Sequence, residues 1–303
     1  MSIVNKRHSI WYIYTYIYDS RIVIWLRIRI KGKRPTVAKR RTKGKAMCKT
    51  IAIYNLKGGV GKTTLAWAAS AILTQRGYRI LSIDLDSQCN LTYSLIGHSD
   101  PDNVLRCLLD GTVLPVVTSD YGYLIPGSPM IDGLPDMADD RATRTRLLDK
   151  AVGRLKQTHD YDYILLDCPP GINLVNVNAL LAADYVVTPT HLDTYSLQGI
   201  SRIADVIRQI QQKDNPSLVW AGIVVTDWRP RLLLTKHLAM QARSAAAAYS
   251  TRLYDSAIKH STRVNELILN RKPLTAAAGD PYIAYSCLVD NILCSFGDKA
   301  ERN

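Results

Sequence analysis

A glycine-rich stretch between an apolar run and an alanine-rich run has the residue types of a phosphate cradle. The β-branched residues 51–54 stop at Asn55, glycines follow, and Lys62, Thr63 and Thr64 then open a helical pattern. Glycine accepts backbone angles that other residues resist, so its N–H groups can converge on an anion. The helix N-terminus and Lys62 add positive charge. This spacing predicts a site for nucleotide phosphates, with Mg²⁺ on the Thr63 hydroxyl.

Carboxylates stand where two further apolar runs end. Residues 79–84 lead into Asp84 and, two positions later, Asp86, whereas residues 163–167 end at Asp167. In an open α/β sheet the carboxyl ends of the strands point at the ligand crevice. Asp84 and Asp86 project to the same side if the strand persists between them. We therefore expect these acids to lie beside the glycine-rich loop.

The rest of the chain must build the sheet that brings these loops together. From residue 50 onward, short apolar runs alternate with amphipathic helical patterns, which is typical of a mostly parallel, twisted sheet covered by helices on both faces. We predict this α/β fold in a single domain. The expected strands are residues 51–54, 79–84, 121–125, 163–167, 185–189, 219–226 and, less distinctly, 253–258. The expected helices are residues 62–76, 104–109, 141–157, 196–212, 231–249 and 281–294, with a further helix after residue 171.

The loop departs from the usual P-loop pattern in one informative way. That pattern places glycine six residues before Lys62, where this chain has Leu56, and a second lysine, Lys57, comes early in the loop. The block resembles the deviant Walker A box of the ParA/MinD class of P-loop ATPases. The resemblance implies the P-loop fold, and a Lys57 that crosses a nucleotide-sandwiched homodimer to the partner's phosphates. It implies ATP binding by Lys57, Gly58, Gly59, Val60, Gly61, Lys62, Thr63 and Thr64.

Residues 84–90 are similar to the switch I box of that family. Ser87 and Cys89 stand where the family usually has proline and glycine, while both carboxylates are kept. The resemblance implies that Asp86 orients the attacking water and that Asp84 supports the Mg²⁺ site. The competing interpretation is that these acids cap a strand at the surface.

Residues 167–171 look like the end of a Walker B strand followed by the family's switch II. Asp167 would hold Mg²⁺ through water, because Mg²⁺ keeps part of its hydration shell. Cys168 is interpreted as a small buried side chain rather than a metal or redox ligand. On the next helix Asn178 fits a short family pattern. The resemblance also assigns Pro189, Thr226 and Asp227 to the nucleotide, although strand ends packed under a loop would look the same.

The basic character of the chain is concentrated at its N-terminus. The formal charge is +13, of which residues 1–46 contribute +12 and residues 47–303 only +1. Alternation over residues 21–30 predicts a strand, and the basic residues 31–45 predict a disordered tail. Central charges, which cost about 2.5–3.5 kcal/mol each on insertion scales, argue against a membrane span. We hypothesise that Met47 is the native start, with residues 1–46 an extension and residues 47–303 the ATPase domain.

A second basic region lies inside the otherwise neutral body. Residues 229–272 contain nine Lys/Arg and two acids. Lysine and arginine contacts to phosphates give sequence-independent DNA affinity, whereas a solvated helix face is the ordinary alternative for such a run. No base-reading helix-turn-helix pattern is present. We expect DNA contacts from Arg229, Arg231, Lys236, Arg243, Lys259 and Arg263.

The six cysteines include no C-x-x-C pair and have no histidines at a spacing suited to zinc binding. We therefore expect free thiols in a reducing, cytoplasmic compartment. The resemblance then implies a short ParA-type ATPase that hydrolyses ATP slowly and dimerises on Mg·ATP. Such a protein binds DNA non-specifically at the nucleoid, and a ParB-type centromere-binding partner stimulates it to partition a plasmid or chromosome. No membrane association is expected, because the C-terminal residues lack a basic amphipathic helix.

Three alternatives stay open. One is a MinD-like, membrane-associated positioning ATPase. Another is a nitrogenase-reductase-like electron carrier, which would need cluster cysteines from two subunits. The third is an ATP-gated scaffold with little hydrolysis, which Ser87 and Cys89 keep plausible.

Overall fold

The computed structural model describes residues 11–18, 22–29, 47–100, 103–109, 115–118, 120–134, 144–193, 195–229 and 233–298. Its contacts divide the chain into two units, Met1–Ala38 and Lys39–Asn303. In the first unit, β1 (Trp11–Tyr18) and β2 (Ile22–Arg29) pair as an antiparallel ladder. The strand predicted from the alternation over residues 21–30 is therefore confirmed. The predicted tail, residues 31–45, lies outside the described residues.

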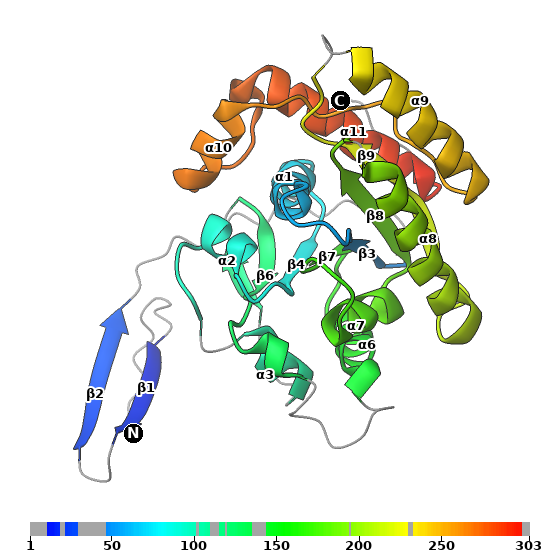
Figure 1. The fold of residues 1–303 in the computed structure, drawn as a ribbon. Coiled ribbons are helices and arrows are strands. Elements are labelled where there is room, and N and C mark those ends of the chain that lie inside the picture. The colour runs from blue at the N-terminus through cyan, green and yellow to red at the C-terminus, as the bar shows by residue number, and fades with distance from the viewer. Residues whose placement is uncertain are drawn as a thin grey trace. The chain divides into compact units, whose positions relative to one another are not determined.

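The second unit is built on a seven-stranded sheet (Figure 1). The strand order is β5-β6-β4-β7-β3-β8-β9, and only the edge strand β5 runs antiparallel to its neighbour. The predicted mostly parallel α/β sheet is confirmed. The strands are β3 (Lys49–Ile53), β4 (Ile80–Asp84), β5 (Val116–Thr118), β6 (Gly122–Ile125), β7 (Tyr163–Asp167), β8 (Tyr185–Thr190) and β9 (Val219–Val225).

Helices cover both faces of this sheet, which explains why its strands are apolar throughout. In β3, Ile51 and Ile53 pack into one core cluster while Ala52 packs into the other, because successive side chains point to opposite faces. The helices of the first face are α1 (Lys62–Gln75), α2 (Asn90–Leu95), α10 (Thr262–Leu269) and α11 (Asp280–Ser295). Those of the second are α3 (Val104–Leu109), α6 (Leu147–Thr158), α7 (Leu174–Ala182), α8 (Ser196–Lys213) and α9 (Leu233–Ala248).

Sequence patterns located the long elements and the six-residue α3, predicted at residues 104–109, but missed other short helices. The helices α2 and α10, of six and eight residues, were not predicted. The strand predicted at residues 253–258 is wrong. This segment runs alongside β9 but forms hydrogen bonds with it only near the two ends of the segment. There the Tyr254 N–H donates to the Ile223 carbonyl and the Ile258 N–H donates to the Val225 carbonyl. A local turn in between, from the Ala257 N–H to the Asp255 carbonyl, interrupts the ladder.

Two further findings bear on the predicted chemistry. Each cysteine is a free thiol, and Cys168 is buried, as expected. Within the described ranges, no helix combines the length and the apolar character that crossing a bilayer requires.

Candidate nucleotide-binding site

The predicted phosphate loop connects β3 to α1 at the carboxyl edge of the sheet. Gly59 and Gly61 have φ angles of 72° and 85°, a left-handed region that side chains with a Cβ rarely adopt. Gly61 is the N-cap of α1, and its carbonyl accepts the first helical hydrogen bond, from the Leu65 N–H at 2.9 Å. The glycines thus serve the turn that aims the helix N-terminus at the loop.

Distant parts of the chain hold the loop in place. The Asn55 side chain donates to the Pro189 carbonyl at 2.7 Å and accepts from the Lys57 N–H at 2.9 Å. The Thr226 hydroxyl donates to the Val60 carbonyl at 2.8 Å, linking the end of β9 to the loop. Pro189 and Thr226 are buried here and position the loop. Their direct contact with nucleotide stays a prediction.

Lys62, predicted to bind phosphate, is only 6% exposed. Its ammonium donates to the Lys57 carbonyl at 3.0 Å, so it reaches back across the loop. Burial lowers the pKa of Lys62, and the nearby Asp167 carboxylate opposes this shift. A desolvated ammonium in a glycine-rich loop is arranged to bind an anion strongly, because little water competes for it.

Asp84 and Asp167 lie opposite each other on neighbouring strands β4 and β7. Asp84 is buried but well supplied with donors, since it accepts the Thr92 N–H at 2.8 Å, the Thr92 hydroxyl at 2.6 Å and the Asp86 N–H at 3.2 Å. Burial raises the pKa of Asp84 to about 6, with these hydrogen bonds acting in the opposite direction. The hydrogen bonds from Thr92 to the Asp84 carboxylate thus hold α2 against the end of β4.

Asp167 is different, because its buried carboxylate lacks a matching set of donors. Among the described residues, neither oxygen accepts a hydrogen bond of ordinary geometry. Burial raises the pKa of Asp167 well above its usual range, and Asp84 adds to the rise, while the Thr63 hydroxyl and the Lys62 ammonium lower it. An orphaned carboxylate beside a threonine hydroxyl fits a divalent cation.

That cation would need ligands from outside the chain. No group of three or more His, Cys, Asp or Glu side chains suited to a metal occurs in the part of the chain that the structure describes. Phosphate oxygens and water supply such ligands to Mg²⁺ in nucleotide sites. The arrangement of Thr63 and Asp167 therefore fits a metal that arrives with a nucleotide, and the assignment of these residues to the metal stays a prediction.

The switch I segment is a tight turn. Asp86 is partly exposed, its carboxylate accepts the Gln88 N–H at 3.0 Å, and its carbonyl accepts the Cys89 N–H at 2.9 Å. Cys89 has a φ of 52°, so the residue that replaces the family's glycine is in the left-handed conformation that glycine favours. The turn is therefore formed despite the substitution, with Asp86 open to the solvent side of the site.

The switch II turn depends on a residue whose role the sequence did not reveal. The Asn176 amide on α7 donates to the Pro169 carbonyl at 3.2 Å and the Gly171 carbonyl at 2.8 Å. The Gly171 N–H in turn donates to the Leu56 carbonyl at 2.9 Å, joining switch II to the phosphate loop. Asn178, which matched the family pattern, instead bonds the Arg144 carbonyl and the Leu148 N–H and joins α7 to α6.

Lys57 and Asp227 both form ion pairs at the surface of the site. Lys57 is exposed, and its ammonium pairs with Asp193. Asp227 has a φ of 53° and lies 2.9 Å from the Arg229 guanidinium and 3.1 Å from Nδ1 of His260. Arg229, predicted to contact DNA, is thus tied to the end of β9 next to the phosphate loop.

The remaining predicted DNA contacts are spread over several segments. Arg243 on α9 pairs with Asp255 at 2.6 Å, and Arg263 on α10 pairs with Glu266 at 3.2 Å. Lys259 is exposed between these helices. Arg231 and the Lys236 side chain lie outside the described residues. The structure places the described arginines at the surface without testing their contact with DNA.

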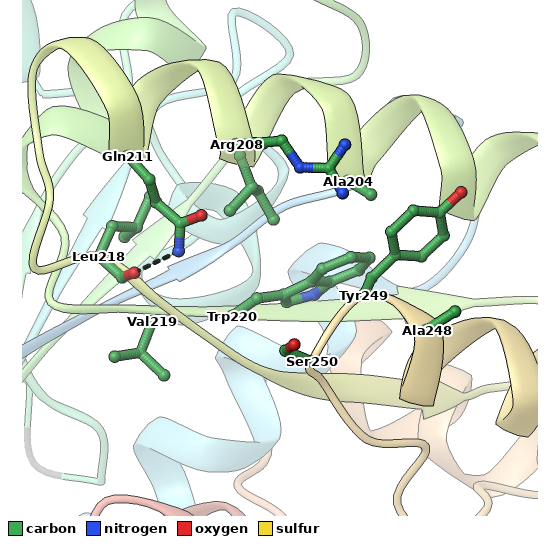
Figure 2. Close-up of a pocket in the computed structure, with 10 residues that line it drawn as sticks. Ala204, Arg208, Gln211, Leu218, Val219, Trp220, Ala248, Tyr249 and Ser250 are labelled. Atoms are coloured by element: carbon green, nitrogen blue, oxygen red, sulfur yellow. Dashed lines mark hydrogen bonds between the residues drawn. The ribbon is translucent and has the colours of Figure 1, made fainter.

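A cavity of about 290 Å³ lies at the opposite edge of the sheet, where β9 begins. Figure 2 shows the residues that line it. It lies between α8, β9 and the end of α9, with the Trp220 and Tyr249 rings adjacent in its wall and Arg208 beside them. None of the residues predicted to bind nucleotide lines it. The phosphate loop and this cavity are therefore separate features.

Comparisons with known proteins agree with this geometry. The sequence pattern of a family described as an AAA domain (AAA_31) matches residues 48–220. The chromosome partitioning protein ParA of Caulobacter vibrioides is 33% identical over 233 residues, covering 75% of this chain and 86% of that protein. The sporulation initiation inhibitor protein Soj of Bacillus subtilis is 32% identical over 235 residues, covering 75% and 90%. The chain belongs to the ParA family of P-loop ATPases.

Solved structures place the same fold around nucleotides. A cobyrinic acid a,c-diamide synthase of Mycobacterium smegmatis with bound ADP and magnesium superimposes with a TM-score of 0.71 at 28% identity, covering 83% of this chain and 96% of that one. A plasmid partition protein of Borrelia burgdorferi bound to AMPPNP gives 0.66 at 22% identity, covering 82% and 98%. The likeness to the second shows the fold alone. Membership in the ParA family confirms the resemblance inferred from the loop.

Proposed function

We propose that this protein is a ParA-type partition ATPase that uses Mg²⁺ and ATP to switch a DNA-binding dimer on and off. The observation that carries the proposal is the pair formed by the buried Lys62 ammonium and the orphaned Asp167 carboxylate at the phosphate loop. Burial disfavours the charged form of both groups. Among the described residues, the Lys62 ammonium has a hydrogen bond to the Lys57 carbonyl, and the Asp167 oxygens have none of ordinary geometry. A nucleotide with its Mg²⁺ supplies the anion and the cation that they need.

The chain's own residues then have distinct tasks. The loop N–H groups from Gly58 to Thr64 cradle the phosphates, Lys62 binds them, and Thr63 and Asp167 hold the Mg²⁺, which neutralises phosphate charge. Asp84 keeps α2 and switch I in place, and Asp86 orients the attacking water. Hydrolysis in P-loop enzymes depends on positioning and charge stabilisation, so a partly exposed Asp86 suits slow turnover that a partner can accelerate.

Two copies would bind face to face, with Lys57 of each reaching the other's phosphates. Closure would bring Arg229 and the basic residues of α9 and α10 from both copies onto one DNA-binding surface. Arg229 supports this link, because its ion pair with Asp227 connects it to the strand whose Thr226 bonds the phosphate loop. A ParB-type protein would stimulate hydrolysis and release DNA, partitioning a plasmid or chromosome at the nucleoid.

The test is DNA retention by the full chain with ADP, with ATP and with a slowly hydrolysed analogue, across a salt series. We expect retention with ATP and the analogue, loss with ADP, and an affinity that falls steeply as salt rises. Vesicles of anionic lipid serve as the control surface. Equal retention with all three nucleotides, or ATP-dependent binding to vesicles rather than DNA, would contradict the proposal.

A further inference from the structure

Lys57 is held by its own chain in the single subunit. Its side chain is 54% exposed, yet the ammonium donates to the Asp193 carboxylate, which lies 136 residues further along. Lys57 begins the phosphate loop, and Asp193 lies between β8 and α8. A long, flexible lysine in water would otherwise sample many rotamers. The contact with Asp193 gives the Lys57 ammonium an acceptor and orients the side chain toward α8 of the same subunit.

Asp193 is fixed independently of Lys57. Its other carboxylate oxygen accepts the Tyr195 N–H at 3.0 Å. Its backbone N–H donates to the Ser196 hydroxyl at 3.2 Å, at the start of α8. The hydrogen bond from Lys57 lowers the pKa of Asp193, so the carboxylate is charged at neutral pH. The acceptor is therefore a charged carboxylate whose residue is held by two further hydrogen bonds, while Lys57 is a long, exposed side chain.

We infer that Asp193 is a positioning residue that holds Lys57 within its own subunit until a partner's nucleotide competes for the ammonium. The inference rests on the proposed sandwich dimer. One ammonium cannot keep its full bonding to Asp193 while it neutralises phosphate oxygens on another subunit. Asp193 thereby sets the concentration at which two ATP-loaded copies close, and restrains closure when few copies are present.

The expected effect is modest and calculable. Exposed ion pairs contribute about 0.2–1 kcal/mol, which corresponds to about 1.4- to 5-fold in an equilibrium constant. Because two such pairs are exchanged per dimer, removing the carboxylate should tighten dimerisation by about 2- to 25-fold. Salt should reduce the difference, since exposed charges are screened.

The first measurement needs neither nucleotide nor dimer. Lys57 in the full chain is modified with an amine-directed reagent, and the rate is followed by mass spectrometry, with the exposed Lys259 as internal reference. Asp193→Asn removes the charge while keeping an acceptor for the Tyr195 N–H. The control, Asp205→Asn on α8, removes a charge that lies 3.7 Å from Arg208. We expect a several-fold faster reaction of Lys57 only in Asp193→Asn. An unchanged rate would overturn the inference.

The second measurement is the dimer dissociation constant by sedimentation equilibrium with Mg²⁺ and a slowly hydrolysed ATP analogue. We expect Asp193→Asn to dimerise 2- to 25-fold more tightly than the native chain, and Asp205→Asn to match the native chain. Weaker or unchanged dimerisation of Asp193→Asn would show that Asp193 does not restrain Lys57. If the native chain forms no dimer while the modification result holds, the proposed function fails and the intramolecular contact stands.

Discussion

The phosphate loop and the basic region between residues 229 and 272 differ in how the fold treats their polar groups. At the loop, Asn55 and Thr226 make buried hydrogen bonds to segments 134 and 166 residues away in the sequence, and Asn176 makes a buried hydrogen bond to the Pro169 carbonyl of switch II. In the basic region, Arg243 and Arg263 are exposed and pair with acids on the same surface. The fold therefore fixes the geometry of the phosphate loop, whereas the charged side chains of the basic region form exposed ion pairs at the surface.

This difference predicts how each region responds to substitution. Buried polar groups are costly to leave without partners, whereas exposed ion pairs contribute little. Changes at the loop should affect both folding and nucleotide binding. Changes in the basic region should affect DNA binding alone.

The largest effect should come from Lys62→Ala. The variant loses the one buried ammonium of the phosphate loop, so ATP affinity should fall by about 10- to 150-fold for each charged hydrogen bond lost, because such bonds contribute about 1.5–3 kcal/mol each. Isothermal titration with ATP and Mg²⁺ measures this loss. Lys259→Ala, which removes an exposed lysine, is the control and should bind ATP normally. Normal ATP binding by Lys62→Ala would contradict the assignment of the loop.

The second effect is a pH dependence of the nucleotide-free chain. The folded pKa of Asp84 is about 6, above the reference value of 3.8, so the folded state binds a proton more tightly than the unfolded state does. The stability contributed by the protonated form is present below about pH 4 and is lost as the pH rises to about 6. Denaturant unfolding at several pH values should show a larger loss in the native chain than in Asp84→Asn, which keeps the contribution of Asp167, whose pKa burial also raises. Parallel pH profiles would contradict it.

A smaller effect is expected from Thr226→Val, which keeps the shape of the side chain and removes its hydroxyl. The Val60 carbonyl loses its hydroxyl donor, whereas the Thr190 carbonyl keeps the Thr226 N–H, so the unfolding free energy should drop by about 1–2 kcal/mol and ATP affinity should weaken with it. Urea unfolding and titration measure the two quantities. Thr262→Val, at the exposed start of α10, is the matched control. A native-like ATP affinity in Thr226→Val would show that this bond does not position the loop.

The same contrast explains how much the sequence could reveal. Asp84 and Asp167 were predicted to lie together because parallel strands end at one edge of a sheet, and the structure places them opposite each other. The hydrogen bonds of Thr226 and Asp193 join segments 166 and 136 residues apart, and those of Asn176 reach back across the switch II turn, which no periodic pattern encodes. Their roles therefore appear only once the fold is known.

Two short helices were missed for a related reason, although the six-residue α3 was predicted at residues 104–109. The helices α2 and α10 have six and eight residues, too few for a clear apolar period, and tertiary contacts decide their conformation. Residues 253–258 have the composition of a strand, but a local hydrogen bond from the Ala257 N–H to the Asp255 carbonyl forms a turn within them. DNA contacts from the basic region remain a prediction, because charge alone does not distinguish a binding surface from a solvated one.

The smallest effect on stability should come from the double variant Lys259→Ala, Arg263→Ala. Both side chains are exposed, so the unfolding free energy should stay within about 0.5 kcal/mol of the native value. DNA affinity should fall equally for unrelated sequences, and the salt dependence should lose about 0.9 in slope per phosphate contact. Fluorescence anisotropy with two unrelated duplexes at several salt concentrations measures both. An unchanged slope would remove these residues from the DNA surface.

ATP-dependent dimerisation is tested most directly by the mass of the native chain in solution, measured by light scattering with and without saturating ATP and Mg²⁺. We expect a single chain without nucleotide, a dimer with Mg·ATP, and a single chain under both conditions for Lys57→Ala. A native chain that stays single when saturated with Mg·ATP, or a Lys57→Ala variant that dimerises normally, would contradict it.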